Sequence, residues 1–143
     1  MKPRGLLLDT HIALWLDSGD SNLQRATIAA IEEVRRGGGT IYFSAISAWE
    51  IALLVESGRM DLDVPVEEWV ERFLDQGGVE PAPLSRTAAS LAYRFHPFAH
   101  RDPGDRLLMA TAVELGCPLV TYDRRMVEFA RRYGSQHRFQ VLC

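Results

Sequence analysis

Short apolar runs alternate with amphipathic helical stretches along almost all of this 143-residue chain. Such runs predict strands where turn residues bound them, although periodicity alone leaves a helix start open for the first. A chain of alternating strands and helices folds as an α/β protein with a mainly parallel sheet, covered by helices on both faces. We therefore predict a three-layer α/β/α sandwich. The predicted strands are residues 5–8, 40–43, 118–122 and 139–142, with 79–84 as a Pro-broken edge strand at best.

The intervening stretches begin and end with helix signals. Ser, Asp and Pro residues precede the apolar periodic segments, and glycines follow most of them. The predicted helices are residues 12–16, a helix from Ser21 to the glycines at 37–39, one capped by Ser44 or Ser47 and ended by Gly58, one from Pro65 to Gly77, one from Ser85 to about Tyr93, one from Asp102 to Gly116, and one from Arg124 to Tyr133 ended by Gly134.

The composition is that of one globular domain, which we take to span residues 1–143. Apolar residues make up 47% of the chain and suffice for a core, so a disordered chain is excluded. The apolar start is interrupted by Asp9, so it resembles neither a signal peptide nor a membrane span. Cys117 and Cys143 have no metal-binding spacing. We expect a cytoplasmic protein with two free thiols.

Four carboxylates are predicted to meet at one edge of the sheet. Asp9 follows the predicted strand at 5–8 and Asp123 follows the one at 118–122, and parallel strands open their carboxyl ends onto the same edge. Asp105 lies in the first turn of a helix, and Glu50 lies inside an otherwise apolar helix. An unpaired carboxylate in apolar surroundings is expensive, which makes Glu50 the hardest of the four to explain as a structural residue.

Each aspartate also has a purely structural interpretation. Asp9 and Asp123 can cap the helices that follow them, and Asp105 can stabilise the positive end of a helix dipole. Asp102 stands directly before Pro103 and is expected mainly as an N-cap. The functional interpretation rests on all the acids meeting in one place, which separate caps do not require.

Carboxylates gathered in one cleft repel each other and need a cation. Hard oxygen ligands select Mg²⁺ or Mn²⁺, and the four histidines are too scattered to offer an alternative set. Such an ion lowers the pKa of its water and neutralises charge on a phosphate, which suits phosphodiester hydrolysis. Thr10 and Thr121 can orient a carboxylate or act as local caps, and Arg106 can pair with a carboxylate or touch a phosphate.

Charge and apolar surface are unevenly distributed. Residues 1–85 carry seven basic and 14 acidic side chains, whereas residues 86–143 carry nine and five. The arginine pairs at 124–125 and 131–132 can guide RNA, hold a partner or form a solvated face. Large apolar residues at 49–55 and at 69 and 73 are expected mainly in the core, with a groove for an apolar partner segment as the alternative.

Four segments together resemble the PIN domain, and more narrowly the VapC-type toxins of bacterial and archaeal toxin–antitoxin pairs. The order and spacing of the segments carry the resemblance, which covers residues 6–142. They are Leu-Leu-Asp-Thr-His at 7–11, followed by Leu14 and Trp15; Ser-Ala-Ile-Ser-Ala-Trp-Glu-Ile at 44–51; His-Arg-Asp-Pro-Gly-Asp-Arg-Leu-Leu-Met-Ala-Thr-Ala at 100–112; and Leu-Val-Thr-Tyr-Asp at 119–123.

The resemblance implies a Mg²⁺- or Mn²⁺-dependent endoribonuclease that forms a homodimer and is inhibited by a small cognate antitoxin. Asp102 matches an acid common in the toxin group, and Thr121 matches a hydroxyl residue two positions before the last acid. We hypothesise that Asp9 and Asp105 hold the principal ion. The acids that match the family's catalytic, metal-binding set are Asp9, Glu50, Asp105 and Asp123.

Three other functions fit the same residues. A PIN nuclease can process RNA without being a toxin. A phosphatase could use Asp9 as a covalent nucleophile, but such sites usually have a second acid two residues later, where this chain has His11. A non-catalytic α/β binding module would use the acids only as helix caps and would bind no Mn²⁺.

Overall fold

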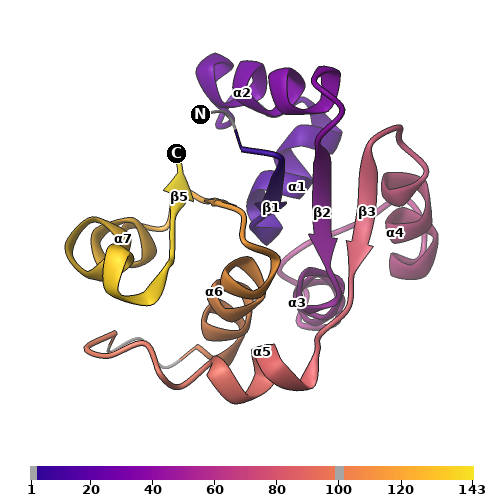
Figure 1. Ribbon diagram of the computed structural model, residues 1–143. Coiled ribbons are helices and arrows are strands. Elements are labelled where there is room, and N and C mark those ends of the chain that lie inside the picture. Colours follow the sequence, from indigo (N-terminus) through magenta and orange to yellow (C-terminus); the bar gives the residue numbers. More distant parts are fainter. Residues whose placement is uncertain (1–2, 99–101) are drawn as a thin grey trace.

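The computed structural model describes residues 3–98 and 102–143, and in these residues one five-stranded sheet runs through the molecule in the order β3-β2-β1-β4-β5 (Figure 1). Every strand pair in it is parallel. The central strand pairs with β2 on one side and with β4 on the other. The strands are β1 (Gly5–Leu8), β2 (Thr40–Ser44), β3 (Val79–Ala82), β4 (Leu119–Val120) and β5 (Val141–Leu142).

Helices cover both faces of the sheet and enclose two apolar cores (Figure 1). One core lies mainly under the first four helices and the other mainly under the last three. The predicted three-layer α/β/α architecture is therefore confirmed. The helices are α1 (Thr10–Ser18), α2 (Arg25–Arg36), α3 (Ala45–Glu56) and α4 (Val66–Leu74) on the first face, and α5 (Arg86–Leu91), α6 (Pro103–Leu115) and α7 (Arg124–His137) on the second.

The central strand shows why its sequence is apolar at every position. Successive side chains of a strand point to opposite faces. Leu6 and Leu8 lie in the first core and Leu7 lies in the second, and all three are fully buried. A strand buried on both faces cannot alternate with polar residues.

Nowhere in the part of the chain that the structure describes is a helix long and apolar enough to span a bilayer.

Several helix boundaries differ from the sequence prediction. Helix α1 is longer than the predicted 12–16, and α4 ends at Leu74, before Gly77. Helix α2 begins at Arg25 with Gln24 as its N-cap residue, because the turn before it is closed by Asp20 Oδ1, which accepts from Asn22 N at 2.8 Å. Ser21 is therefore not its cap. Helix α7 continues through Gly134 to His137.

The predicted edge strand, with its proline, is confirmed as β3 at the margin of the sheet, where a missing backbone N–H is tolerated. The last two strands are shorter than predicted, with two residues each. Their ladder still extends one residue past β4, since Thr121 N donates to Leu142 O at 3.1 Å. These short strands end directly before the acidic edge.

Candidate active site

Asp9 and Asp123 follow two strands that are neighbours in the sheet. Leu8 pairs with Val120, and Asp9 N donates to Val120 O at 3.0 Å, so both aspartates lie at the same carboxyl edge. Each also caps the next helix: Asp9 Oδ1 accepts from Thr10 N at 2.8 Å, and Asp123 Oδ1 accepts from the first amides of α7. The capping that the structural interpretation expects is therefore present, and the two caps also meet at one edge, as the functional interpretation requires.

Thr121 connects the two aspartates. Its hydroxyl donates to Asp9 Oδ2 at 2.6 Å and accepts from Asp123 N at 3.0 Å. The side chain is fully buried, so this hydroxyl has no water to compete with. It fixes the direction of the Asp9 carboxylate, as the sequence hypothesis expected of a residue that orients a carboxylate.

Thr10 links α1 to α3 through a residue that the sequence analysis did not assign to the site. Its hydroxyl donates to Ser47 Oγ at 2.9 Å, and both residues are fully buried. Ser44, rather than Ser47, caps α3 by accepting from Ile46 N at 3.0 Å. Ser47 lies three residues before Glu50 and hence on the same side of the helix, a spacing that could have indicated its place.

Glu50 is a half-buried acid among other acids. Its Oε1 is buried and has no hydrogen-bond partner among the residues the structure describes. Burial, and then the like charges of Asp9, Asp102 and Asp105, raise the pKa of Glu50 from 4.5 to about 8. This carboxyl lacks the positive partner that its surroundings call for.

Asp102 and Asp105, at the start of α6, lie near Glu50 and Asp9. Asp105 is only 8% exposed. Burial is the largest cause of a pKa of about 7 for Asp105, followed by the charges of Asp102, Asp9 and Asp123, with Arg125 opposing. Asp102 is the N-cap of α6, as predicted.

Gly104 is a second residue of this region that the sequence analysis missed. Asp102 Oδ1 accepts from its backbone N–H at 2.9 Å. A Cβ at this position would lie 2.7 Å from Glu50 Oε1 and 3.2 Å from Asp102 Oδ1. The glycine therefore leaves the space in which two carboxylate oxygens approach α6, and its place between Asp102 and Asp105 is the signal that could have marked it.

The acids from four elements form an electrostatically coupled cluster, here called the acidic edge: Asp9, Glu50, Asp102, Asp105 and Asp123. Burial also raises the pKa of Asp9, although the hydrogen bond from Thr121 opposes this. Within residues 3–98 and 102–143, no three His, Cys, Asp or Glu side chains stand in the geometry of a closed metal site. The donors are hard carboxylate oxygens, and one of them is buried without a partner, which suits Mg²⁺ or Mn²⁺ in kind.

Arg106 points to a different region from its neighbour Asp105. Its guanidinium donates to Ala92 O at 3.2 Å and to Phe98 O, and lies 5.0 Å from the ring centroid of Tyr93. Adjacent residues on a helix face in different directions. These contacts hold α6 against the segment that follows α5.

The large apolar residues divide into core and surface. Trp69 and Phe73 are buried, and their rings stack with centroids 5.2 Å apart, as expected for core packing. Trp49 and Leu53 on α3 are 51% and 53% exposed, so they remain available to a partner.

Comparison with known proteins identifies the family. The chain belongs to the PIN domain family, whose model matches residues 6–132. It is similar to Ribonuclease VapC22 of Mycobacterium tuberculosis, with 36% identity over 124 residues that cover 85% of this chain and 88% of that protein.

Solved structures share the fold at low identity. One is VapBC2 from Rickettsia felis bound to a DNA fragment from its promoter, with a TM-score of 0.64, 17% identity, and coverage of 89% of this chain and 92% of that chain. Another is FitAcB from Neisseria gonorrhoeae, with a TM-score of 0.56, 18% identity, and coverage of 96% of each chain. The architecture is thus that of a PIN domain.

Proposed function

We propose that this protein is a metal-dependent endoribonuclease and the toxin of a toxin–antitoxin pair. The observation that carries the proposal is the buried Oε1 of Glu50, which finds no hydrogen-bond partner within residues 3–98 and 102–143 and lies among the other carboxylates of the acidic edge. An oxygen that caps a helix accepts hydrogen bonds from backbone amides, whereas an oxygen that binds a cation must be left with a free lone pair. The similarity to a protein named Ribonuclease VapC22 supports RNA as the substrate.

Asp9 and Asp105 would hold the ion, with Asp123 and Glu50 completing its surroundings directly or through water. Mg²⁺ or Mn²⁺ fits this arrangement because Mg²⁺ commonly keeps several waters and uses only one or two carboxylates. When bound, such an ion activates water and neutralises charge on the phosphate.

The chain's own residues prepare the site for the ion and the substrate. Thr121 holds Oδ2 of Asp9 in one direction, and the helix amides hold Oδ1 of Asp123. With a pKa of about 8, Glu50 holds a proton at neutral pH until a cation displaces it. The carboxylates of the acidic edge are therefore already in position, and the site would release the proton of Glu50 when it binds a metal ion.

The partners we propose are an RNA substrate, a second copy of the chain and a small cognate antitoxin. The antitoxin follows from the similarity to VapC-type toxins, and the exposed Trp49 and Leu53 offer apolar surface to such a protein. Co-expression with the product of the adjacent reading frame, followed by co-purification, tests this partner.

The function is tested by replacing Asp9 or Asp105 with Asn, which keeps the shape of the side chain but removes its charge. Asn at position 9 can still cap α1, and position 105 lies in the first turn of α6, whose cap is Asp102. Cleavage of single-stranded RNA with Mn²⁺ should fall by about 10²–10⁴-fold in each variant. Asp61→Asn, at an exposed position between α3 and α4, is the matched control and should cleave at the parent rate. Parent-rate cleavage by both site variants would refute the mechanism, and a trapped aspartyl-phosphate on Asp9 would favour a phosphatase instead.

A further inference from the structure

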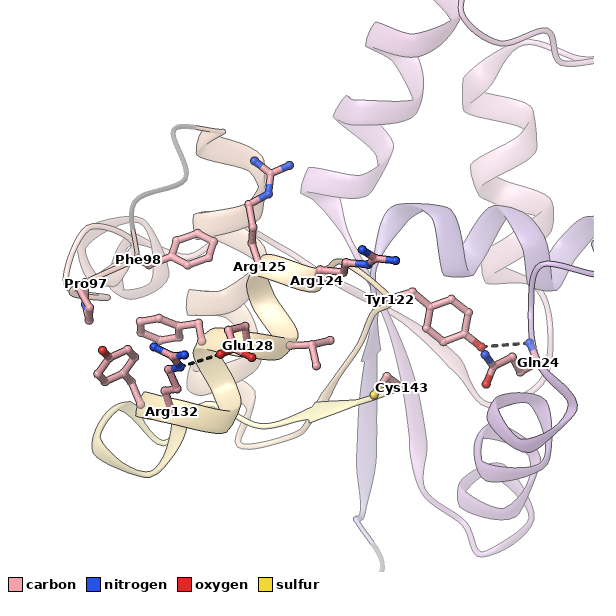
Figure 2. A pocket seen from close by; sticks show the side chains of 12 residues that line it. Gln24, Pro97, Phe98, Tyr122, Arg124, Arg125, Glu128, Arg132 and Cys143 are labelled. Atoms are coloured by element: carbon pink, nitrogen blue, oxygen red, sulfur yellow. Dashed lines mark hydrogen bonds and ion pairs between the residues drawn. The ribbon is translucent and has the colours of Figure 1, made fainter.

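A groove of about 1020 Å³ runs along α7 beside the acidic edge (Figure 2). It follows the helix over residues 124–133, a length of about 14 Å at 1.5 Å per residue. We call it the α7 groove. The lining residues used below are Tyr122, Arg124, Arg125, Phe129, Arg132 and Tyr133.

The rim of the α7 groove is positively charged. Arg124 and Arg125 are exposed at one end of it, and Arg132 is exposed further along. Arg124 has no carboxylate partner among the described residues. Glu128 accepts from Arg132 Nε at 2.6 Å and also pairs with Arg131, so the only described acid of the groove is already shared between two cations.

The floor of the groove is aromatic. Phe129 is buried there, and the half-buried rings of Tyr122 and Tyr133 border it. The Tyr122 ring is held in place because its hydroxyl accepts from Gln24 N at 3.1 Å (Figure 2). The same hydroxyl also forms a hydrogen bond with Thr27 Oγ1 at 2.6 Å. A cationic rim over rigid aromatic surface is the combination that binds the backbone and bases of single-stranded nucleic acid.

The groove is continuous with the acidic edge. Tyr122 stands in the chain between Thr121, which bonds Asp9, and Asp123. Arg125 Nε lies 4.0 Å from Asp123 Oδ1. A strand lying along α7 would therefore pass directly into the carboxylate cluster.

We propose that the α7 groove binds the single-stranded RNA that flanks the scissile phosphate, with Arg124 and Arg125 contacting phosphates and Tyr122 and Tyr133 contacting bases. The inference rests on the proposed ribonuclease function and adds the path of the substrate. Arg132 contributes less than Arg124, because Glu128 offsets part of its charge. Charge complementarity and continuity with the acids favour RNA over an apolar protein segment, because the exposed guanidinium groups of Arg124 and Arg125 can contact phosphates but gain nothing from an apolar chain.

Binding is measured without cleavage, by fluorescence anisotropy of a labelled single-stranded RNA with EDTA present. The variants are Arg124→Ala/Arg125→Ala and, as the matched control, Arg131→Ala. Arg131 is exposed on the same helix and shares Glu128 with Arg132, but it lies outside the groove. The double variant should bind at least about tenfold more weakly, and the slope of log K against log salt should fall by about 1.4, because each single-strand phosphate contact contributes about 0.7.

The outcomes separate this proposal from the proposed function. An unchanged slope in the double variant, or an equal loss in Arg131→Ala, overturns the groove even if the parent cleaves RNA. Loss of dimer or of antitoxin binding in the double variant, with RNA affinity intact, assigns the groove to a protein partner and also overturns it. Groove-dependent binding by a parent that never cleaves RNA with Mn²⁺ supports the groove and refutes the nuclease.

Discussion

Replacing Glu50 with Gln should stabilise the metal-free protein at alkaline pH. The folded-state pKa of Glu50, about 8, lies above the ordinary value of 4.5, so the folded state keeps a proton that the unfolded chain has lost. The contribution of Glu50 to the free energy of unfolding is therefore fully present below about pH 4.5 and is lost as the pH rises through about 8. Gln carries no charge, and its amide can donate to the neighbouring carboxylates.

The size of the effect follows from the same pKa. Each pKa unit is worth about 1.4 kcal/mol, so complete desolvation of Glu50 would give at most about 5 kcal/mol. Glu50 is only half-buried, and solvent screening reduces this to about 2 kcal/mol. At an m-value of about 2 kcal/mol/M, the variant's urea midpoint should exceed the parent's by about 1 M at alkaline pH.

The assay is urea unfolding followed by circular dichroism in EDTA, at about pH 5 and about pH 9. The difference between Glu50→Gln and the parent should be small at the lower pH and reach its full size at the higher one. Glu56→Gln, at an exposed position on the same helix, is the control. A parallel pH dependence in the parent and Glu50→Gln would refute the assignment of Glu50 as an uncompensated buried acid.

Further predictions concern the same cluster. Gly104→Ala should reduce RNA cleavage at least tenfold yet change the unfolding free energy by less than about 1 kcal/mol. The added Cβ displaces the flexible end of Glu50 and crowds Asp102 Oδ1 only slightly, and cleavage kinetics and urea unfolding check both effects. Thr121→Val should cost about 1–3 kcal/mol and lower the cleavage rate by removing the bond to Asp9, and Thr121→Ser should restore both. Mn²⁺ at a hundredfold excess over Kd should stabilise the parent by about 2.7 kcal/mol, and Asp9→Asn/Asp105→Asn should abolish this gain in thermal melts.

Much of the fold was predictable because strong local signals agree with tertiary position. The apolar run at 5–8 occupies the central strand, and the carboxyl ends of neighbouring parallel strands brought Asp9 and Asp123 to one edge as expected. Helix ends were less predictable because glycine has two uses. Gly134 was expected to end a helix, but a Cβ there would lie 2.5 Å from Phe139 O, so it allows the chain to pack back closely.

The residues of the site could be predicted where the chemistry depends on residue type, and less well where it depends on how each side chain is oriented in the fold. The sequence identifies Glu50 as anomalous, but only the structure shows that its Oε1 has no hydrogen-bond partner in the described part of the chain. Ser47 and Gly104 were missed, because their only signal is their spacing from Glu50 and from the aspartates at 102 and 105, which gains meaning once those acids are known to meet. Arg106 was considered with Asp105 as its neighbour in sequence, yet its described contacts lie with the carbonyls of Ala92 and Phe98.

Three helices begin at acids of the cluster, with Asp9, Asp102 and Asp123 as their N-caps. The amino end of a helix carries about half a positive charge from its aligned peptide dipoles. Three such ends supply a permanent counter-charge that neither diffuses away nor titrates. The apoprotein can thus tolerate its own acids, and a chelated sample should remain folded and take up the ion again on dialysis.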